Sequence, residues 1–428
     1  MPREMKDSGI EWIGEIPSEW KVAMLKRIAS IQTGSTPAKS EENIYYSTEK
    51  GIPWIKAENL GTNLSIKETT VYLTDDGAKE GRVFEPNTVY VCCIASVGKV
   101  GYSELTASCN QQINALCFKN FNWKYGYYMS CSQEMEYLLN ASGNVMKIIN
   151  SDKQSSIMCP VPPLSEQQKI ADYLDSECAK IDDVITKTKT TIEEYKKLKQ
   201  SVITEAVTKG IRPNREMKGS GIEWIGEIPK EWDVKVAFQL FSQVKNKNEG
   251  LIEKNLLSLS YGKIKRKSID TIGGLLPENF DGYNIIEKDD IVLRLTDLQN
   301  DHTSLRVGLS NERGIVTSAY LTLRNYSNNM PLYLYYYLHS YDIYKGFYGM
   351  GAGVRQGLNW DGVKLLKIVL PPVEEQIEIT DYLEKQVNIF DTLIAKKEQI
   401  AAELESYKKS LIYEYVTGKK EVIQWTAI

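Results

Sequence analysis

The sequence predicts an α+β fold in which two mixed α/β domains are joined by two long helices that form an antiparallel coiled coil. Three observations predict it: a sixteen-residue box occurs twice, a proline-led helical segment occurs twice, and the two intervening inserts share no comparable identity. The predicted segments are a first domain over 1–160, a central helix over 161–212, a second domain over 213–369 and a C-terminal helix over 370–428.

The duplication is explicit in the two boxes. Residues 5–20 read MKDSGIEWIGEIPSEW, and residues 217–232 read MKGSGIEWIGEIPKEW, with two differences in sixteen positions. A weaker repeat pairs VPPLSEQQKI over 161–170 with LPPVEEQIEI over 370–379. The chain is therefore a tandem duplication in which two similar frames carry two dissimilar inserts, as two different recognition tasks would require.

The segment after each Pro-Pro pair predicts a long helix. Apolar or tolerant residues recur at steps of mostly three or four, which is the pattern of a coiled-coil seam. Ser165 and Gln168 fit a capping box at the start of the first helix. Gly210 and Gly418 follow the two helices. About 44 residues give a helix of about 65 Å. We expect the two helices to pair within the chain; packing of each on its own insert, or pairing between chains, is the alternative.

Within the inserts, runs rich in β-branched and aromatic residues predict strands over 88–95 and 290–295. The aromatic run over 330–339 favours a short helix rather than an aromatic binding platform. Both inserts are therefore interpreted as mixed α/β domains with short strands.

Composition restricts the class of protein. A chain of 428 residues with 42% hydrophobic and 25% charged residues is typical of a globular protein of two or three domains. No apolar run reaches the roughly 18–20 residues of a membrane span, and the N-terminus lacks a signal-peptide core. Seven cysteines without a C-x-x-C pair indicate neither a disulfide framework nor a zinc site. We therefore expect a cytoplasmic protein that makes no membrane contact.

Charge is distributed unevenly between frame and inserts. The whole chain has a net charge of −4, whereas residues 21–160 carry +1 and residues 233–370 carry +3. The acidity therefore lies in the frame. Basic residues cluster over 263–267, a run that a solvated loop also explains. Two inserts that are both less acidic than their frame favour contact with a polyanion.

Motifs for catalysis are missing from the sequence. It contains no G-x-x-x-x-G-K-[ST], no G-x-S-x-G and no H-E-x-x-H. The Pro-Pro pairs lack the polar and aromatic neighbours of an adenine methyltransferase box. We therefore predict no catalytic residue and no metal ligand. A self-contained DNA methyltransferase or nuclease remains one alternative, and a coiled-coil adaptor for proteins remains another.

The inserts instead gather amide, hydroxyl and arginine side chains. Asn and Gln pair bidentately with adenine, and Arg pairs with guanine. Gln111, Gln112 and Asn114 lie in the first insert, and Arg306 and the pair 355–356 lie in the second. Each residue taken singly also fits an ordinary surface group. The grouping therefore indicates DNA recognition only in combination with the duplicated frame.

Taken together, these patterns resemble the specificity subunit of type I restriction–modification systems over essentially the full length. The resemblance rests on GIEWIGEIP over 9–17 and 221–229 and on the duplicated Pro-Pro-x-x-E-Q helix start. In the first insert, GSTP over 34–37 and IPWI over 52–55, with GKV over 98–100 and NQQ over 110–112, are similar to parts of a target recognition domain. In the second insert the similar motifs are RLTDL over 294–298, IVTSAY over 315–320 and VRQ over 354–356.

The resemblance implies a non-catalytic, sequence-specific DNA-binding subunit. Each insert would read one half of a bipartite double-stranded target, and the helices would set the spacer. The implied partners are two modification (methyltransferase) subunits, which bind S-adenosylmethionine and methylate adenine at N6, and two restriction (translocase and nuclease) subunits. The latter use ATP and magnesium, and this chain itself would bind no cofactor.

The predicted site residues follow from these motifs. The predicted DNA-binding residues are Gly34, Ser35, Thr36, Lys56, Asn59, Lys99, Gln111, Gln112, Asn114, Lys263, Lys265, Arg266, Arg294, Thr296, Asp297, Arg306, Thr317, Ser318, Tyr320, Arg355 and Gln356. The predicted partner-binding residues are Trp12, Trp224, Glu166, Gln167, Glu375 and Gln376; the two tryptophans could equally pack on the recognition domains.

Overall fold

The computed structural model describes residues 3–38, 42–61, 65–268, 280–298, 301, 304–350 and 357–422. The chain divides into two compact units. Unit 1 comprises Met1–Thr190 and Glu398–Ile428, and unit 2 comprises Thr191–Lys397. Each unit therefore combines one insert with a part of each long helix, whereas the segments predicted from the sequence follow chain order.

The two long helices are α6 (Leu164–Lys209) and α9 (Val373–Val416), with 46 and 44 residues. Most of their predicted seam is buried or half-buried, for example at Ile170 in α6 and Ile379 in α9. Two residues predicted for the seam, Leu198 and Tyr407, are instead 52% and 55% exposed. Each helix ends before a glycine in the left-handed conformation, with φ of +79° at Gly210 and +73° at Gly418. These features confirm the predicted helices.

The predicted capping box at the start of α6 is wrong. The helix begins at Leu164, one residue before Ser165. Gln168 donates to Asp172 Oδ1 at 2.8 Å and accepts from Asn122 Nδ2 at 2.7 Å. The Pro163 carbonyl instead accepts the backbone N–H groups of Glu166 and Gln167. Gln168 therefore contacts Asn122 of the first insert and does not cap the helix start.

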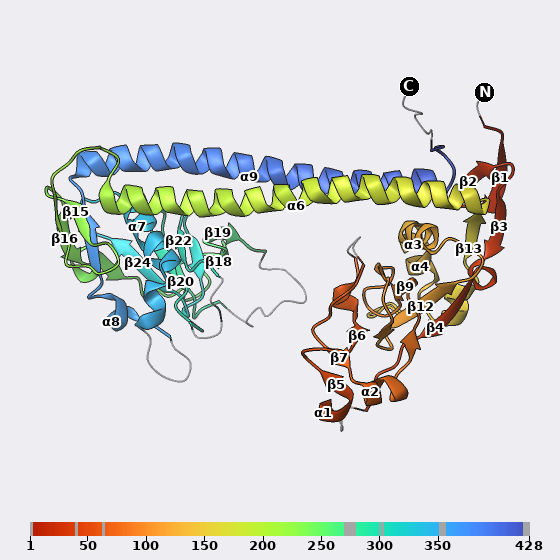
Figure 1. The fold of residues 1–428 in the computed structure, drawn as a ribbon. Coiled ribbons are helices and arrows are strands. Elements are labelled where there is room, and N and C mark those ends of the chain that lie inside the picture. Colours follow the sequence, from red (N-terminus) through yellow and green to blue (C-terminus); the bar gives the residue numbers. More distant parts are fainter. Residues whose placement is uncertain are drawn as a thin grey trace. The chain divides into compact units, whose positions relative to one another are not determined.

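The helices pair antiparallel within each unit, as predicted. In unit 1, Lys408 bonds to Asp182 at 2.6 Å, whereas the later α6 residue Lys189 bonds to the earlier α9 residue Glu405 at 2.9 Å. In unit 2, Tyr195 of α6 packs against Phe390 of α9, with ring centroids 6.4 Å apart. Figure 1 shows the two helices side by side. The seam therefore pairs within one chain.

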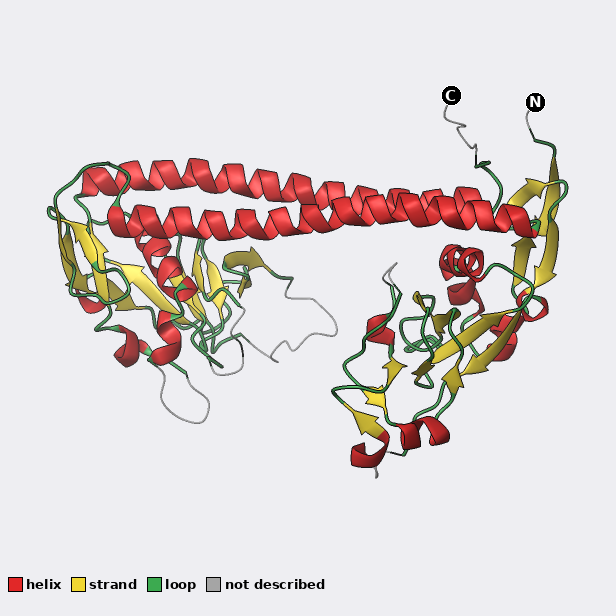
Figure 2. Ribbon diagram, in the orientation of Figure 1, coloured by secondary structure: helices red, strands yellow, loops and turns green. Residues whose placement is uncertain are grey.

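Both units are built on a four-stranded antiparallel sheet, although their inserts differ in sequence. Figure 2 shows strands in yellow in both units. In unit 1 the strand order is β10-β9-β12-β4, and in unit 2 it is β22-β21-β24-β17. Strands of corresponding position follow in the same chain order. Their bounds are β4 (Ala29–Thr33), β9 (Thr88–Cys92), β10 (Val100–Ser103), β12 (Ile113–Phe118), β17 (Phe241–Gln243), β21 (Ile291–Leu293), β22 (Val307–Leu309) and β24 (Leu321–Asn325).

Smaller shared elements connect each sheet to the frame. Each box forms a hairpin, and each sheet is preceded by a strand and a 3-10 turn. The strand that leads into each Pro-Pro pair is antiparallel to that preceding strand. The bounds are β1 (Met5–Ile10), β2 (Gly14–Pro17), β3 (Lys21–Met24), η1 (Leu25–Arg27), β13 (Met158–Val161), β14 (Met217–Gly219), β15 (Glu227–Pro229), β16 (Asp233–Val236), η4 (Ala237–Gln239) and β25 (Lys367–Leu370).

The remaining strands distinguish the units. Unit 1 adds a five-stranded sheet with the order β5-β7-β6-β11-β8, whereas unit 2 adds the hairpin β18–β19 and a two-stranded antiparallel sheet of β20 and β23. The strands are β5 (Tyr46–Ser47), β6 (Ile52–Ile55), β7 (Tyr72–Leu73), β8 (Val83–Phe84), β11 (Ala107–Cys109), β18 (Leu257–Ser260), β19 (Lys263–Arg266), β20 (Asn284–Ile286) and β23 (Gly314–Val316). The helices are α1 (Glu42–Tyr45), η3 (Ala57–Asn59), α2 (Asp75–Glu80), α3 (Trp123–Ser132), α4 (Glu134–Asn140), α5 (Ser151–Ser155), α7 (Pro331–Ile343), η5 (Gly346–Gly349) and α8 (Trp360–Val363).

A tyrosine-rich helix packs in the core of unit 2. Tyr333 and Tyr337 of α7 are fully buried. The Tyr333 hydroxyl donates to the carbonyls of Val207 at 3.1 Å and Val369 at 3.0 Å, which joins α7 to α6 and β25. The predicted short helix over 330–339 is therefore confirmed, and these aromatic side chains stabilise the core. Within the described part of the chain, no helix is long and apolar enough to cross a membrane.

Candidate nucleic-acid interface

The register of the shared sheet brings several loops to one edge. In unit 1, the last residue of β4, Thr33, pairs with Asn114 near the start of β12, and Ile113 pairs with Cys92 at the end of β9. The turn before β12, the loop between β9 and β10, and the segment after β4 therefore meet. We call this the loop edge; in unit 1 it comprises residues 34–36, 93–99 and 110–112.

Backbone hydrogen bonds close the loop edge of unit 1. Ser35 donates from its backbone to the Cys109 carbonyl at 2.9 Å, and Cys93 donates to the Gln112 carbonyl at 2.7 Å. Thr36 Oγ1 bonds to Gln111 Oε1. The predicted GST and NQQ motifs, 76 residues apart in sequence, are thus neighbours in the structure.

Lys56 and Asn59 lie beside the same edge. The Asn110 backbone donates to the Ile55 carbonyl at 3.1 Å, which brings the end of β6 to the 110–112 turn. Asn59 accepts the Lys56 backbone N–H at 2.8 Å, and the Lys56 ammonium lies 5.1 Å from the Trp54 ring centroid. Lys99, the last residue of the 93–99 loop, is exposed and also lines a hollow of about 740 Å³ between α4, α6 and α9.

Two predicted residues of unit 1 are inside the protein. Asn114 is 1% exposed; it accepts from Thr33 Oγ1 at 2.8 Å and donates to Gln154 Oε1 at 2.7 Å. Gly34 is buried, and a Cβ there would lie 2.3 Å from the Cys109 carbonyl oxygen. The prediction that Asn114 reads a base is therefore wrong: its amide satisfies buried partners. Gly34 permits close approach of two backbones.

Sequence reasoning missed Arg82. Its backbone donates to Ser35 Oγ at 2.7 Å, and its guanidinium bonds to the Thr33 carbonyl. The residue is exposed and adds a positive charge to the loop edge. The local sequence GRVFEPN contains no signal for this placement, because the contact depends on the pairing of β8 with β11.

Unit 2 presents its loop edge in the same way. Leu293 at the end of β21 pairs with Leu321 at the start of β24 and with Val307 at the start of β22. The loop edge of unit 2 comprises residues 294–298, 301, 304–306 and 317–320 of the described chain. Thr296, Asp297 and Ser318 are exposed there, and the Arg294 side chain is 37% exposed. Thr317 and Tyr320 are half-buried.

The basic cluster of unit 2 lies on the β18–β19 hairpin. Lys263, Lys265 and Arg266 are all exposed, as a phosphate contact requires. Arg266 bonds to Glu312 Oε1 at 2.8 Å, and the Lys263 ammonium lies 3.8 Å from Asp391 Oδ2. Because both ion pairs are exposed, solvent screens them, and an incoming phosphate can compete for the same side chains.

Arg306 does not face solvent. Its side chain is fully buried, and all its bonds are to protein atoms, so the prediction of direct base contact by Arg306 is wrong. Arg355 and Gln356, also predicted to contact DNA, lie outside the described residues.

The predicted partner-binding residues take part in two equivalent clamps. In unit 1, Glu166 at the start of α6 accepts from Arg3 Nη1 at 2.6 Å and from the indole N–H of Trp20 at 2.8 Å. In unit 2, Glu375 at the start of α9 accepts from Arg215 Nη2 and from the indole N–H of Trp232, at 3.0 and 3.1 Å. The equivalent contacts explain why the box and the helix start are duplicated together. Sequence reasoning missed Arg3 and Arg215.

The two glutamines of the helix starts are also satisfied within the chain. Gln167 donates to the Pro162 carbonyl and accepts the Asn122 backbone N–H, both at 2.8 Å. Gln376 donates to the Pro371 carbonyl and accepts the Met330 backbone N–H, both at 2.9 Å. Gln167 is 3% exposed and Gln376 is fully buried. Each glutamine thus fixes the helix that follows the sheet, α3 or α7, against a long helix.

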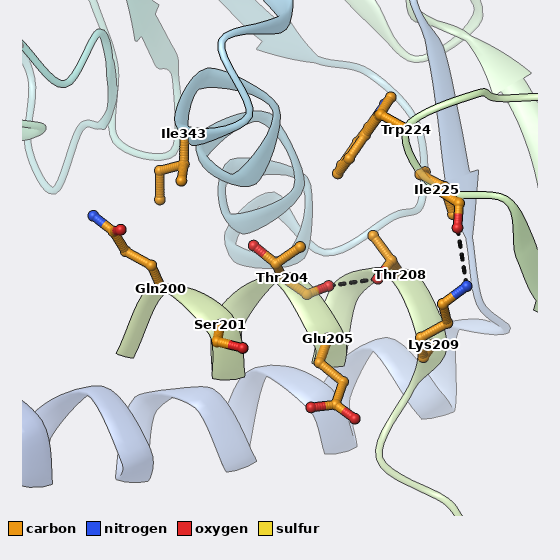
Figure 3. Close-up of a pocket in the computed structure, with 9 residues that line it drawn as sticks. All are labelled: Gln200, Ser201, Thr204, Glu205, Thr208, Lys209, Trp224, Ile225 and Ile343. Carbon is orange, nitrogen blue, oxygen red and sulfur yellow. Dashed lines mark hydrogen bonds between the residues drawn. The ribbon is translucent and has the colours of Figure 1, made fainter. Parts of the chain in front are cut away.

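The box tryptophans differ between the units. Trp12 packs on Tyr413 of α9 with ring centroids 6.0 Å apart. Trp224 packs on tyrosines of α7 and lines a hollow of about 540 Å³, with Thr204 and Thr208 of α6 on the opposite wall (Figure 3). Both indole N–H groups are buried without an acceptor among the described residues. Contact of Trp12 and Trp224 with partner subunits stays a prediction.

Reactive groups are few in the described part of the chain. No group of three or more His, Cys, Asp or Glu side chains there is placed to hold a metal ion. Burial raises the pKa of the Cys93, Cys131 and Cys159 thiols to about 12, so they remain protonated at neutral pH and are poor nucleophiles. The loop edges offer hydrogen-bonding and basic side chains for recognition.

Comparison with known proteins agrees with this architecture. The MjaVIII type I restriction enzyme specificity subunit of Methanocaldococcus jannaschii is 25% identical over 432 residues, which cover 95% of this chain and 94% of the relative. The EcoKI specificity subunit of Escherichia coli strain K12 is 21% identical over 448 residues, which cover 97% of this chain and 92% of the relative. A chain in a solved structure describing complex assembly and conformational transition of the type I R-M system matches with a TM-score of 0.69 at 14% identity, covering 95% of this chain and 99% of that one; this likeness concerns the fold.

The model of one protein family matches twice, once in each half of the chain. It is described as the type I restriction modification DNA specificity domain, and it matches residues 17–194 and 229–405. The two matches contain the two shared sheets and most of both long helices. The chain therefore belongs to the family of type I restriction–modification specificity subunits, with two DNA specificity domains in tandem.

Proposed function

We propose that this chain is the sequence-specific DNA-binding subunit of a type I restriction–modification complex, and that each unit reads one half of a bipartite target. One observation carries the proposal: the same sheet occurs twice, and its loop edge has different side chains in the two units. A constant scaffold with variable loops at one edge suits two independent reading tasks.

The side chains at the loop edges fit base reading in the major groove. Gln111 and Gln112 have amides suited to adenine, and Arg294 has a guanidinium suited to guanine. Arg82, Lys56 and the β18–β19 lysines would bind phosphates. DNA binding should therefore weaken steeply as salt rises. A coiled-coil adaptor for proteins would instead bind in a salt-insensitive way and show no preference among DNA sequences.

The complex would include modification and restriction subunits, two of each. The duplicated frame supports this number, because each clamp has an equivalent in the other unit. The methyl donor S-adenosylmethionine, ATP and magnesium would bind to those partners, and this chain would contribute recognition. The long helices would set the spacer between the half-sites. Inserting four residues near Thr190 would add about 6 Å of helix and should lengthen the spacer or weaken assembly; normal assembly with an unchanged spacer would contradict this role.

The direct test is a genome-wide map of N6-methyladenine in host cells with and without this gene. We expect a split motif that is methylated in the parent strain and unmethylated in the deletion strain. Complementation with the intact gene should restore the motif. A motif that persists after deletion, or a lost motif that is continuous rather than split, would contradict the proposal.

A further inference from the structure

The loop between β21 and β22 in unit 2 is organised around one buried side chain. Arg306 precedes β22 and is 0% exposed. Its Nη1 donates to the carbonyls of Arg294 at 3.0 Å and Thr296 at 2.8 Å. Its Nη2 donates to the carbonyl of Asp297 at 3.3 Å and also to that of Asp301. Four carbonyl oxygens of one loop therefore converge on one guanidinium.

The fifth donor completes the arrangement. Arg306 Nε donates to Tyr348 Oη at 3.0 Å, and the Tyr348 hydroxyl donates to the Asp301 carbonyl at 3.1 Å. A guanidinium has five N–H donors, so all of them are used inside the protein. The planar fork suits this task, whereas a lysine ammonium offers three donors from a single point.

The surroundings balance the buried charge. Asp342 of α7 accepts the Arg306 backbone N–H at 2.6 Å, and Asp301 Oδ2 lies 3.9 Å from Arg306 Nη2. Burial raises the pKa of Asp342 to about 6, and the positive charge of Arg306 opposes this shift. A buried arginine is costly unless it is paired and hydrogen-bonded, and both conditions are met here.

The bonds constrain the backbone of the loop and leave its side chains variable. Leu295 and Leu298 are buried, whereas Thr296 and Asp297 are exposed. Asp297 has a left-handed backbone with φ of +56°. Because the acceptors are carbonyl oxygens, the loop could carry other exposed side chains without losing these bonds.

The corresponding loop of unit 1 is held together without a buried arginine. Residues 93–99 form a shorter loop, in which Gly98 donates to the Cys92 carbonyl at 3.0 Å and Lys99 donates to the Ser96 carbonyl at 3.3 Å. Backbone hydrogen bonds within the short loop therefore hold its conformation. In the longer loop of unit 2, the Arg306 side chain makes the hydrogen bonds that hold the backbone.

We propose that Arg306 is the positioning residue of the unit 2 recognition loop, holding Arg294, Thr296 and Asp297 where they meet the bases of one half-site. This inference rests on the proposed function, because it assumes that the loop edge reads DNA. Arg306 itself touches no base. It acts through the four carbonyl groups that it fixes.

The test compares Arg306→Lys with a matched control, Arg313→Lys. Arg313 is 51% exposed and pairs with Glu253 and Glu287 at the surface of the same unit. The full chain, assembled with its modification subunits, is measured on the mapped target and on duplexes with single base-pair changes in each half. Discrimination is the ratio of Kd values for changed and unchanged duplexes.

We expect Arg306→Lys to lower discrimination roughly 10-fold in the unit 2 half, the scale of one lost base contact, and to leave the other half within about 2-fold. Arg313→Lys should leave both halves unchanged. A uniform loss of binding with unchanged discrimination would overturn the inference, because it would indicate a merely structural role. Absence of discrimination in the wild-type complex would instead overturn the proposed function.

A second, milder variant tests the same role if Arg306→Lys does not fold. Tyr348→Phe removes only the hydroxyl that bonds to Arg306 Nε and to the Asp301 carbonyl. It should change discrimination in the same half as Arg306→Lys, by a smaller factor. If a folded Tyr348→Phe protein and a folded Arg306→Lys protein both keep wild-type discrimination, the positioning role is wrong.

Discussion

Unit 1 and unit 2 share a sheet and a clamp but differ in what surrounds them. The order β10-β9-β12-β4 in one unit matches β22-β21-β24-β17 in the other. Unit 1 adds a separate five-stranded sheet, whereas unit 2 adds the hairpin β18–β19 and a two-stranded sheet of β20 and β23. The duplicated residues therefore specify the scaffold, whereas the divergent residues are concentrated where the scaffold presents loops.

The largest effect should come from breaking one clamp and then the other. Glu375→Ala would leave Arg215 and Trp232 without their buried acceptor and should lower the free energy of unfolding of unit 2 by about 3–5 kcal/mol. Urea titration measures this change. Glu166 is more exposed, at 19% for its side chain, so Glu166→Ala should cost less.

The neighbouring residue Glu374 provides the control. It is exposed, and Glu374→Ala should change the free energy of unfolding by no more than about 0.5 kcal/mol. Equal losses for Glu374→Ala and Glu375→Ala would contradict the clamp.

Acid should destabilise unit 2 through its buried histidine. Burial lowers the pKa of His339 from 6.5 to about 4, with a smaller effect from Lys199. Its folded pKa is below its unfolded pKa, so the stability that it permits at pH 7 is lost as pH falls from about 6.5 towards 4. Between pH 7 and pH 5 the expected loss is about 2 kcal/mol.

Comparison with His339→Gln isolates this histidine. Asp342, whose raised pKa acts in the opposite direction over the same range, is present in both proteins and cancels in the difference. The wild-type protein should lose about 2 kcal/mol relative to the variant between pH 7 and pH 5 in urea titrations. A pH-independent difference would show that His339 does not stay neutral in the folded protein.

Substitutions of Asn114 and Gln111 should have different effects, the first on the stability of unit 1 and the second on DNA binding. Asn114→Ala removes buried hydrogen bonds to Thr33 and Gln154 and should cost about 1–3 kcal/mol of unfolding free energy. Gln111 is exposed, so Gln111→Ala should leave stability within about 0.5 kcal/mol but weaken DNA binding. Urea titration and a salt-matched binding assay distinguish the two. Loss of DNA binding by Asn114→Ala without loss of stability would indicate that Asn114 contacts a base.

The smallest effect concerns the helical pair. Lys189 and Glu405 are 60% and 54% exposed, so a double-mutant cycle should give a coupling energy of about 0.2–1 kcal/mol. Added salt should reduce it. A coupling above about 2 kcal/mol would mean that the pair is shielded from solvent.

Much of the scaffold could be predicted from the sequence, because its signals are local. The seam residues of α6 and α9, the glycines that end them and the strand over 88–92 depend on short-range patterns. The shared sheet could not be predicted: β9 and β21 differ in sequence, and their common topology is set by long-range pairing. The burial of Asn114 and Arg306 could not be predicted either. A polar residue beside a strand is expected at the surface, and the buried partners of these two residues include ones that are distant in the sequence. Arg82 and the clamp arginines depend on contacts between distant segments.

Each unit should read its own half of the target, and an exchange of one insert tests whether it does. Residues 21–160 are replaced by the corresponding insert of a specificity subunit with a different target, and N6-methyladenine is mapped in cells that carry the hybrid. We predict a motif in which one half is new while the other half and the spacer are unchanged. A change of both halves together in a folded, active hybrid would contradict independent reading by the two units.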